Sequence, residues 1–160
     1  MPTPAVNAQL RNAELGFRVQ GAAKTVPQNA TQTVFTVTGG RILVNLLYGL
    51  VTTVIAGTTP SARYIATPTV GTLNNMCANG VITAAEVGSH FVVPNTGGIA
   101  TALIVSTAGS GSSSAGAGYG GLIVAPGTIG FATTAADATG AVQHSLFYVP
   151  LDPAATVVAN

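Results

Sequence analysis

After residue 30, apolar and polar residues alternate along the chain with the period of a β-strand. Residues Thr31–Thr38 read TQTVFTVT, so that every second side chain belongs to a more apolar set. Residues 41–48, RILVNLLY, are apolar at both sets of positions, as expected of a strand that is covered on both sides. Gly39 and Gly40 lie between the two segments and predict a two-residue hairpin turn, because glycine adopts positive φ without steric cost.

The same pattern continues to the end of the chain. Residues 50–56 predict a strand after Gly49, where we expect a bend or a bulge. Further strands are predicted at 62–68, 81–85, 90–93, 99–107, 122–125, 128–134, 141–148 and Thr156–Ala159. They follow one another about every ten residues, with Gly, Pro and Asn between them, and neither helical periodicity nor an internal repeat is visible. The sequence therefore predicts an all-β protein, a β-sandwich or jelly roll.

Residues 1–30 differ from the rest of the chain. Prolines interrupt them and their apolar residues are scattered, but they contain three of the five basic residues, Arg11, Arg18 and Lys24. We interpret residues 1–30 as an extended N-terminal arm that orders on contact with a neighbour, and residues 31–160 as the β-sandwich domain. An ordinary first strand or a frayed terminus stays open as the alternative.

The chain carries very little charge. It has five basic and four acidic residues among 160, a net charge of +1, 48% hydrophobic residues and a mean hydropathy of +0.53. A free monomer of this composition has little to keep it soluble, so either it enters a membrane or other protein covers much of its surface. The 21 uncharged residues between Arg41 and Arg63 approach the length of a membrane span. Asn45, Gly49 and Pro60 interrupt them and β-branched residues are frequent, which favours buried strands and no membrane contact.

The ionisable residues suggest no catalytic or metal site. The carboxylates and histidines are Glu14, Glu86, Asp137, Asp152, His90 and His144. His144 and Ser145 are neighbours on a predicted strand, so their side chains point to opposite faces, and no nucleophile motif accompanies them. The spacing fits neither zinc nor calcium, although an oligomer could gather one histidine from each copy. We therefore predict no enzyme, no metal and no cofactor, and a buried structural role for the single cysteine, Cys77.

Charge also bears on the possible partners. The five basic residues are spread from Arg11 to Arg63, too sparsely for a phosphate-binding patch, so no nucleic-acid partner is predicted. All five lie in the first 63 residues, which is consistent with a basic arm that meets an acidic protein surface. Residues 108–121, AGSGSSSAGAGYGG, predict a flexible loop, with Tyr119 as a possible exposed contact. No secretory signal opens the sequence, which predicts an intracellular site of synthesis.

Two segments carry a resemblance when they are read together. The first is TVFTVTGGRILVNLLYGLVTTVI, residues 33–55, and the second is GTIGFATTAADATGAVQHSLFYVPLDPAATVVAN, residues 127–160. This pattern resembles small virion structural proteins of tailed bacteriophages, including capsid decoration (cement) proteins. The resemblance covers about residues 33–159 and depends on strand and turn patterns. It implies a sandwich or jelly-roll module, commonly trimeric, that sits on the capsid surface and ties neighbouring major capsid protein subunits together.

The resemblance implies no catalytic residue. Under it, Arg11, Arg18 and Lys24 would help to dock the arm, and residues 43–47 would lie in the core or in a trimer interface. A tail- or fibre-associated protein that contacts the host surface through Tyr119 is the first alternative. A carbohydrate-binding β-sandwich is the second, although the chain has no Trp, four Tyr and five Phe to stack on sugars. An enzyme would need His90, His144, Asp137 and Asp152 to converge.

Overall fold

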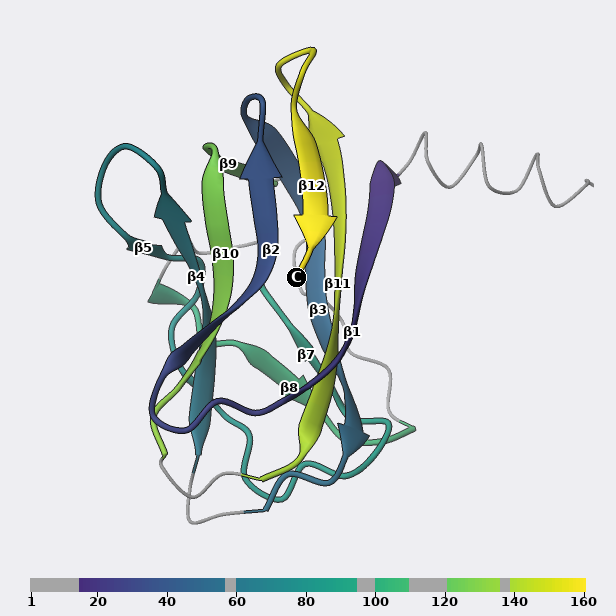
Figure 1. Cartoon of the computed structure of the whole chain (residues 1–160). Helices are drawn as coiled ribbons and strands as arrows, with labels where there is room; N and C mark the ends of the chain where they lie inside the picture. The colour runs from purple at the N-terminus through teal and green to yellow at the C-terminus, as the bar shows by residue number, and fades with distance from the viewer. Residues whose placement is uncertain (1–14, 57–59, 95–99, 110–120, 136–138) are drawn as a thin grey trace, which may run out of the picture.

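A computed structural model describes residues 15–56, 60–94, 100–109, 121–135 and 139–160 of the chain. Its strands form two antiparallel sheets that face each other (Figure 1). The first sheet contains β1 (Phe17–Thr25), β3 (Ile42–Thr53), β7 (His90–Val92), β8 (Ile104–Ser106), β9 (Leu122–Val124) and β11 (Ala141–Pro150). The second contains β2 (Thr31–Thr38), β4 (Ser61–Pro68), β5 (Asn74–Asn75), β6 (Gly80–Val81), β10 (Gly127–Thr133) and β12 (Thr156–Ala159). The predicted all-β sandwich is confirmed.

The core fills the space between the two sheets. The first sheet runs β1-β11-β3-β7-β8, with β9 also paired to β3, and the second runs β12-β2-β10-β4-β5, with β6 also paired to β4. The largest buried side chains of the core include Phe35, Phe91, Phe131, Ile42 and Leu146. Each such side chain contributes about 1.5–3 kcal/mol through removal from water, so apolar burial dominates the stability of the sandwich.

Several predicted strands agree with the structure, and others are shorter or longer. β2 and β12 have the predicted bounds. Of the predicted strand 81–85 only Val81 lies in a strand, β6, and of 99–107 only Ile104–Ser106 does. Residues 42–53 form one long strand, β3, but no bulge lies at Gly49, where one was expected. The register against β11 shifts instead at Asn45 and at Thr52, each of which is left without a partner in β11.

The hairpin predicted at Gly39 and Gly40 is also wrong. β2 and β3 belong to different sheets, so the two glycines carry the chain from one sheet to the other. Gly39 has φ 74°, and a Cβ there would overlap the carbonyl oxygen of Ala154 in the β11–β12 connection. Beside it, Arg41 donates two side-chain hydrogen bonds, of 3.1 and 3.0 Å, to the Asp152 carboxylate. The glycines therefore permit close contact between two connections at one end of the sandwich.

The expectation of an extended arm requires correction for its second half. Phe17–Thr25 is β1, which pairs antiparallel with β11 and forms an edge of the first sheet. β1 also lies near β12 of the second sheet, because a Cβ on Gly21 would be 3.6 Å from the Cβ of Ala159. Lys24 donates a 3.2 Å hydrogen bond from Nζ to the Thr33 carbonyl, so β1 also contacts the second sheet. This segment is an ordinary first strand, and the part of the predicted arm before residue 15 lies outside the described residues.

Gly49 offers a test of this packing. A Cβ on Gly49 would lie 2.7 Å from Cγ1 of Val142 and 2.9 Å from the hydroxyl of Tyr64, both buried. Gly49→Ala should therefore lower the free energy of unfolding by about 1–3 kcal/mol, because the core must shift to admit the methyl group. Gly21→Ala is the matched control in a strand, since its Cβ meets only an ordinary contact, and it should stay within about 0.5 kcal/mol of wild type. Urea unfolding measures both values, and equal losses would contradict the packing described.

Candidate interaction surface

The two histidines considered for catalysis lie on opposite sides of the first sheet. His144 faces the core from β11 and is 2% exposed, and its Nδ1 is 2.8 Å from the Tyr64 hydroxyl of β4. The ring of Phe131 lies 5.0 Å from the His144 ring. Ser145 faces the other side of the strand, as the alternation predicts, and His90 lies on that outer side through its pairing with Leu50. The fold therefore does not bring the histidines together.

The position of His144 suits a structural hydrogen bond. Burial, reinforced by the positive charge of Lys24, lowers the pKa of His144 from 6.5 to about 3. Burial likewise raises the pKa of Tyr64 well above 10. Both side chains are therefore neutral across the physiological pH range, and the contact between the Tyr64 hydroxyl and His144 Nδ1 is a hydrogen bond between neutral groups. Asp137, the carboxylate considered with them, lies outside the described residues, and the described residues contain no group of three or more metal-ligating side chains.

Cys77 has the buried role that the sequence predicts. It is fully buried, and the Tyr64 backbone N–H donates to its sulfur at 3.5 Å. Burial raises the pKa of its thiol, which keeps it protonated and poorly nucleophilic.

A cleft of about 200 Å³ opens beside β7 and β8. It is lined by residues 83–86, by Ser89 and by residues 105–107, so hydroxyls and the single carboxylate of Glu86 supply its polar groups. One carboxylate with hydroxyls gives neither a nucleophile–base pair nor a typical cation site. The cleft therefore does not identify a reaction.

The strand register places nine apolar side chains on the outer surface of the first sheet, together with the polar residues Gln20, Gln143, Ser145, His90 and Ser106. Cross-strand neighbours on this side include Phe147 with Leu46, and Tyr48 with Val92. A third row crosses three strands, from Val149 to Leu43 to Ile123. We call the apolar side chains of this surface the apolar face: Leu43, Leu46, Tyr48, Leu50, Val92, Ile104, Ile123, Phe147 and Val149.

The apolar face has the composition of a protein interface. Ile123 is 68% exposed and Val149 is 38% exposed, whereas Phe147 and Val92 are buried within the chain and the other members are half-buried. Arg18 of β1 lies at its margin, with its guanidinium carbon 5.8 Å from the centre of the Phe147 ring and its Nη2 3.5 Å from the Tyr48 hydroxyl. Interface centres are enriched in aromatic residues and Arg and depleted in Lys, Asp and Glu. No carboxylate belongs to this outer surface among the paired residues that the structure describes.

The outer surface of the second sheet has a different chemistry. Thr36, Thr128 and Thr67 are cross-strand neighbours on β2, β10 and β4, and Thr38 lies 3.0 Å from Thr156 between their hydroxyl oxygens. We call this surface the threonine face: Thr31, Thr33, Thr36, Thr38, Thr67, Thr128 and Thr156. Its hydroxyls can bond to water, so this side is suited to solvent.

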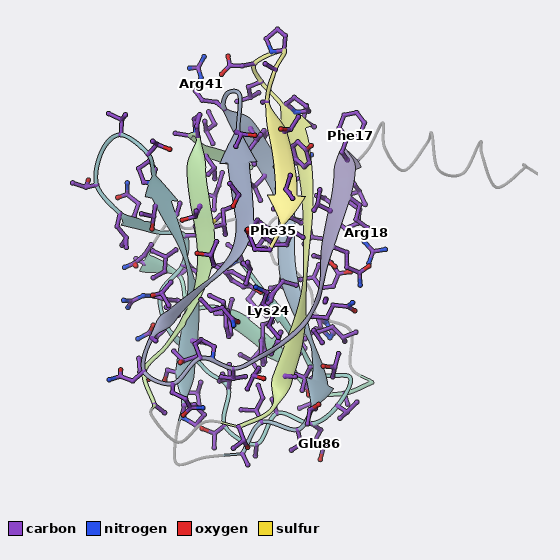
Figure 2. The ribbon with its side chains drawn as sticks, viewed as in Figure 1. Phe17, Arg18, Lys24, Phe35, Arg41 and Glu86 are labelled. Atoms are coloured by element: carbon purple, nitrogen blue, oxygen red, sulfur yellow. The ribbon has the colours of Figure 1, made fainter. Side chains whose placement is uncertain are left out.

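The basic residues predicted as arm contacts do not form one patch. Arg18 points to the outer side of β1, whereas Lys24 reaches the Thr33 carbonyl of the second sheet. Arg41 and Glu86 lie at opposite ends of the sandwich (Figure 2). Arg11 and Tyr119 lie outside the described residues, as does most of the predicted Gly/Ser loop. Among the described residues, Arg41 and Glu86 therefore lie at the ends of the sandwich and Arg18 on an edge strand, whereas Arg63 lies on the outer side of β4 in the second sheet.

Comparison with protein-family models, with curated proteins and with solved structures finds no match for this chain. No helix in the described residues is long and apolar enough to cross a membrane. The functional argument therefore depends on the fold and on the chemistry of the two faces.

The buried histidine gives a pH prediction with a defined sign. The pKa of His144 is about 3 in the folded chain and 6.5 ordinarily, so between these values the unfolded chain binds a proton that the folded chain does not. The contribution of His144 to the free energy of unfolding is therefore fully present above about pH 6.5. It is lost as the pH is lowered, by up to about 1.4 kcal/mol per pH unit. Urea unfolding between about pH 7 and pH 4.5 measures this slope, above the range in which most carboxylates titrate.

His144→Gln removes the titrating group and serves as the comparison. Its stability at neutral pH should be lower, because the Tyr64 contact changes, but its loss of stability on acidification should be smaller than that of wild type. The same slope in both proteins would show that His144 is not the group responsible.

Proposed function

We propose that this chain is a structural protein of a tailed-phage virion that decorates the capsid and stabilises it by bridging neighbouring major capsid protein subunits, as a homo-oligomer and most simply a trimer. It is made in the host cytoplasm and resides on the virion surface. The proposal assigns it no catalytic activity, no metal and no cofactor. The observation that carries it is the broad, uncharged apolar face on a rigid β-sandwich.

The apolar face favours assembly over a solution enzyme. A contiguous exposed apolar surface on a soluble domain marks an interaction site, because leaving it in water costs free energy and invites aggregation. A chain with nine charged residues among 160 has few solubilising groups with which to offset that cost. Membership of a large assembly removes the cost, since the face is then covered by other protein.

The path of the chain supports the jelly-roll form of the proposal. Its strands pair in a nested order, β1 with β11, β2 with β10, β3 with β7 and β4 with β5. This is the pairing of one long antiparallel ribbon rolled into two sheets, which is how a jelly roll is built, and jelly rolls are frequent in viral capsid and lectin domains. β8 and β9 occupy the connection between β7 and β10, and β12 extends the second sheet.

Rigidity explains how such a module stabilises a shell. β-branched side chains in paired strands lose little conformational entropy on binding, because their rotamers are already restricted. A symmetric oligomer that contacts two or three shell subunits gains affinity from linked contacts, and each bridge opposes separation of those subunits. On the outer side of the first sheet Ile104, Ile123 and Val149 are such residues, and on the second sheet threonines such as Thr36 and Thr128 are.

Co-sedimentation with preformed capsids that lack the protein tests the proposal. Purified protein should bind in a saturable manner and at a fixed ratio to capsid subunits. Decorated capsids should also resist heat or chelator disruption better than bare capsids. The control is the same protein incubated with purified phage tails.

The two arms of the experiment separate the alternatives. Binding to tails and not to capsids would replace decoration by a tail- or fibre-associated role. Binding to neither, with retention on a glycan array, would favour a carbohydrate-binding module and overturn the proposal.

A further inference from the structure

The apolar face and the threonine face require different environments, and only one of them suits water. On the first sheet, the row Val149–Leu43–Ile123 and the pair Phe147–Leu46 place apolar side chains on three adjacent strands, β11, β3 and β9. On the second sheet, the corresponding surface presents hydroxyls at cross-strand positions. A partner should therefore cover the first sheet and leave the second exposed.

We infer that the apolar face is the contact between copies of this chain. The inference deepens the proposed function and depends on it only in part, since self-association is measurable without capsids. Neighbouring copies cover Leu46, Ile123 and Val149, while the threonine face stays towards solvent. Contacts with a shell then fall on the ends and edges of the sandwich, where Arg41, Asp152 and Glu86 are found.

Charge complementarity points to a second copy as the partner. The face has Arg18 at its margin and no carboxylate among the paired residues described, so a basic partner would bury charges without counterparts, and an acidic or phosphate-rich partner would find only Arg18. The matching partner is an uncharged apolar protein surface. The chain itself offers one, at equal concentration and from the moment of synthesis, and its net charge of +1 gives copies little mutual repulsion.

The dimensions of the first sheet set an upper limit on the contact that the face can make. β1, β11, β3 and the strands beside β3 lie about 4.8 Å apart, and β11 has ten residues. Four strand positions and ten residues of length give a flat area of roughly 19 by 34 Å, about 650 Å². A stable interface buries about 800 Å² from each partner. Because Phe147 and Val92 are already buried within the chain, the exposed Ile123 and Val149 and the half-buried members of the face supply a part of that area.

The contribution of Arg18 fits this placement. Its guanidinium is already held over the Phe147 ring and near Gln20 Oε1, at 2.6 Å from Nη2. A pre-positioned Arg beside an aromatic ring loses little rotamer freedom on contact, and this pair of residue types is frequent among the strongest interface contacts. Arg18 therefore marks the rim of the interface on the β1 side.

A matched pair of substitutions tests the inference on the purified full chain. Ile123 on β9 and Val158 on β12 are both β-branched and well exposed, at 68% and 59%, on opposite sheets. Ile123→Glu places a charge in the apolar face, whereas Val158→Glu places the same charge on the side of the threonine face. Light scattering over a range of protein concentrations gives the mass of wild type and of both variants, and circular dichroism shows whether each is folded.

Wild type should form one discrete oligomer, Val158→Glu should retain its mass, and Ile123→Glu should associate at least about tenfold more weakly. Val149→Glu, on a different strand of the same face, should repeat the effect of Ile123→Glu. A monomeric wild type, open-ended aggregation, an unchanged mass of folded Ile123→Glu, or equal effects on both sheets would each overturn the inference.

Capsid co-sedimentation of the same proteins keeps the two proposals separate. Self-association through the apolar face without capsid binding would refute decoration and leave the inference intact. Capsid binding by an Ile123→Glu protein that keeps its oligomeric mass would refute the inference and leave decoration intact.

Discussion

The pairing of β3 with β11 is the interaction on which the rest of the structure depends. These two strands are the longest among the described residues and lie at the centre of the first sheet, with β1 beside one and β7 and β9 beside the other. Their inward side chains, such as Leu47 and Leu146, form the middle of the core, and their outward side chains, such as Leu46 and Phe147, form the middle of the apolar face. One strand pair therefore determines both what holds the sandwich together and what it offers to a partner.

Low charge and an apolar face are two consequences of the same composition. A sandwich needs only one apolar side per strand, and its other side is normally polar and charged. The second sheet meets this need with threonine hydroxyls, whereas the first sheet has Leu, Val, Ile, Tyr and Phe on both sides. Threonine preserves β-propensity while it hydrogen-bonds to water, so one sheet can remain wet without charges. The other sheet can be left in water only at a cost, which is the physical reason to expect a partner there.

The sequence predicts most strands but not which strands are neighbours. β2 and β12 have alternation strong enough to give their bounds, and residues 41–48 correctly signal coverage on both sides. Gly39 and Gly40 predict a hairpin because the local pattern cannot show that β2 pairs with β10 and β3 with β11. β1 is mistaken for an arm because it has only Phe17 and Val19 as large apolar residues, and its partner lies more than a hundred residues away. The apolar face is foreseeable as a property of β3, but its extent requires the register of five strands.

The register of β3 cannot follow from hydrophobicity, because both of its sides are apolar and a shift by one residue would exchange one set for the other. Two residues break this ambiguity. Gly49 must face inward, because it lies opposite the buried Tyr64–His144 pair and a larger side chain would collide with it. Asn45 must stay out of the core, and it occupies a bulge from which its amide donates to the Leu15 carbonyl at 3.1 Å. Uninterrupted alternation from Ile42 would turn Leu46 and Tyr48 inward and Gly49 outward; the bulge at Asn45 reverses this. The polar Asn45 and the small Gly49 thus decide which leucines of β3 form the core and which face outward.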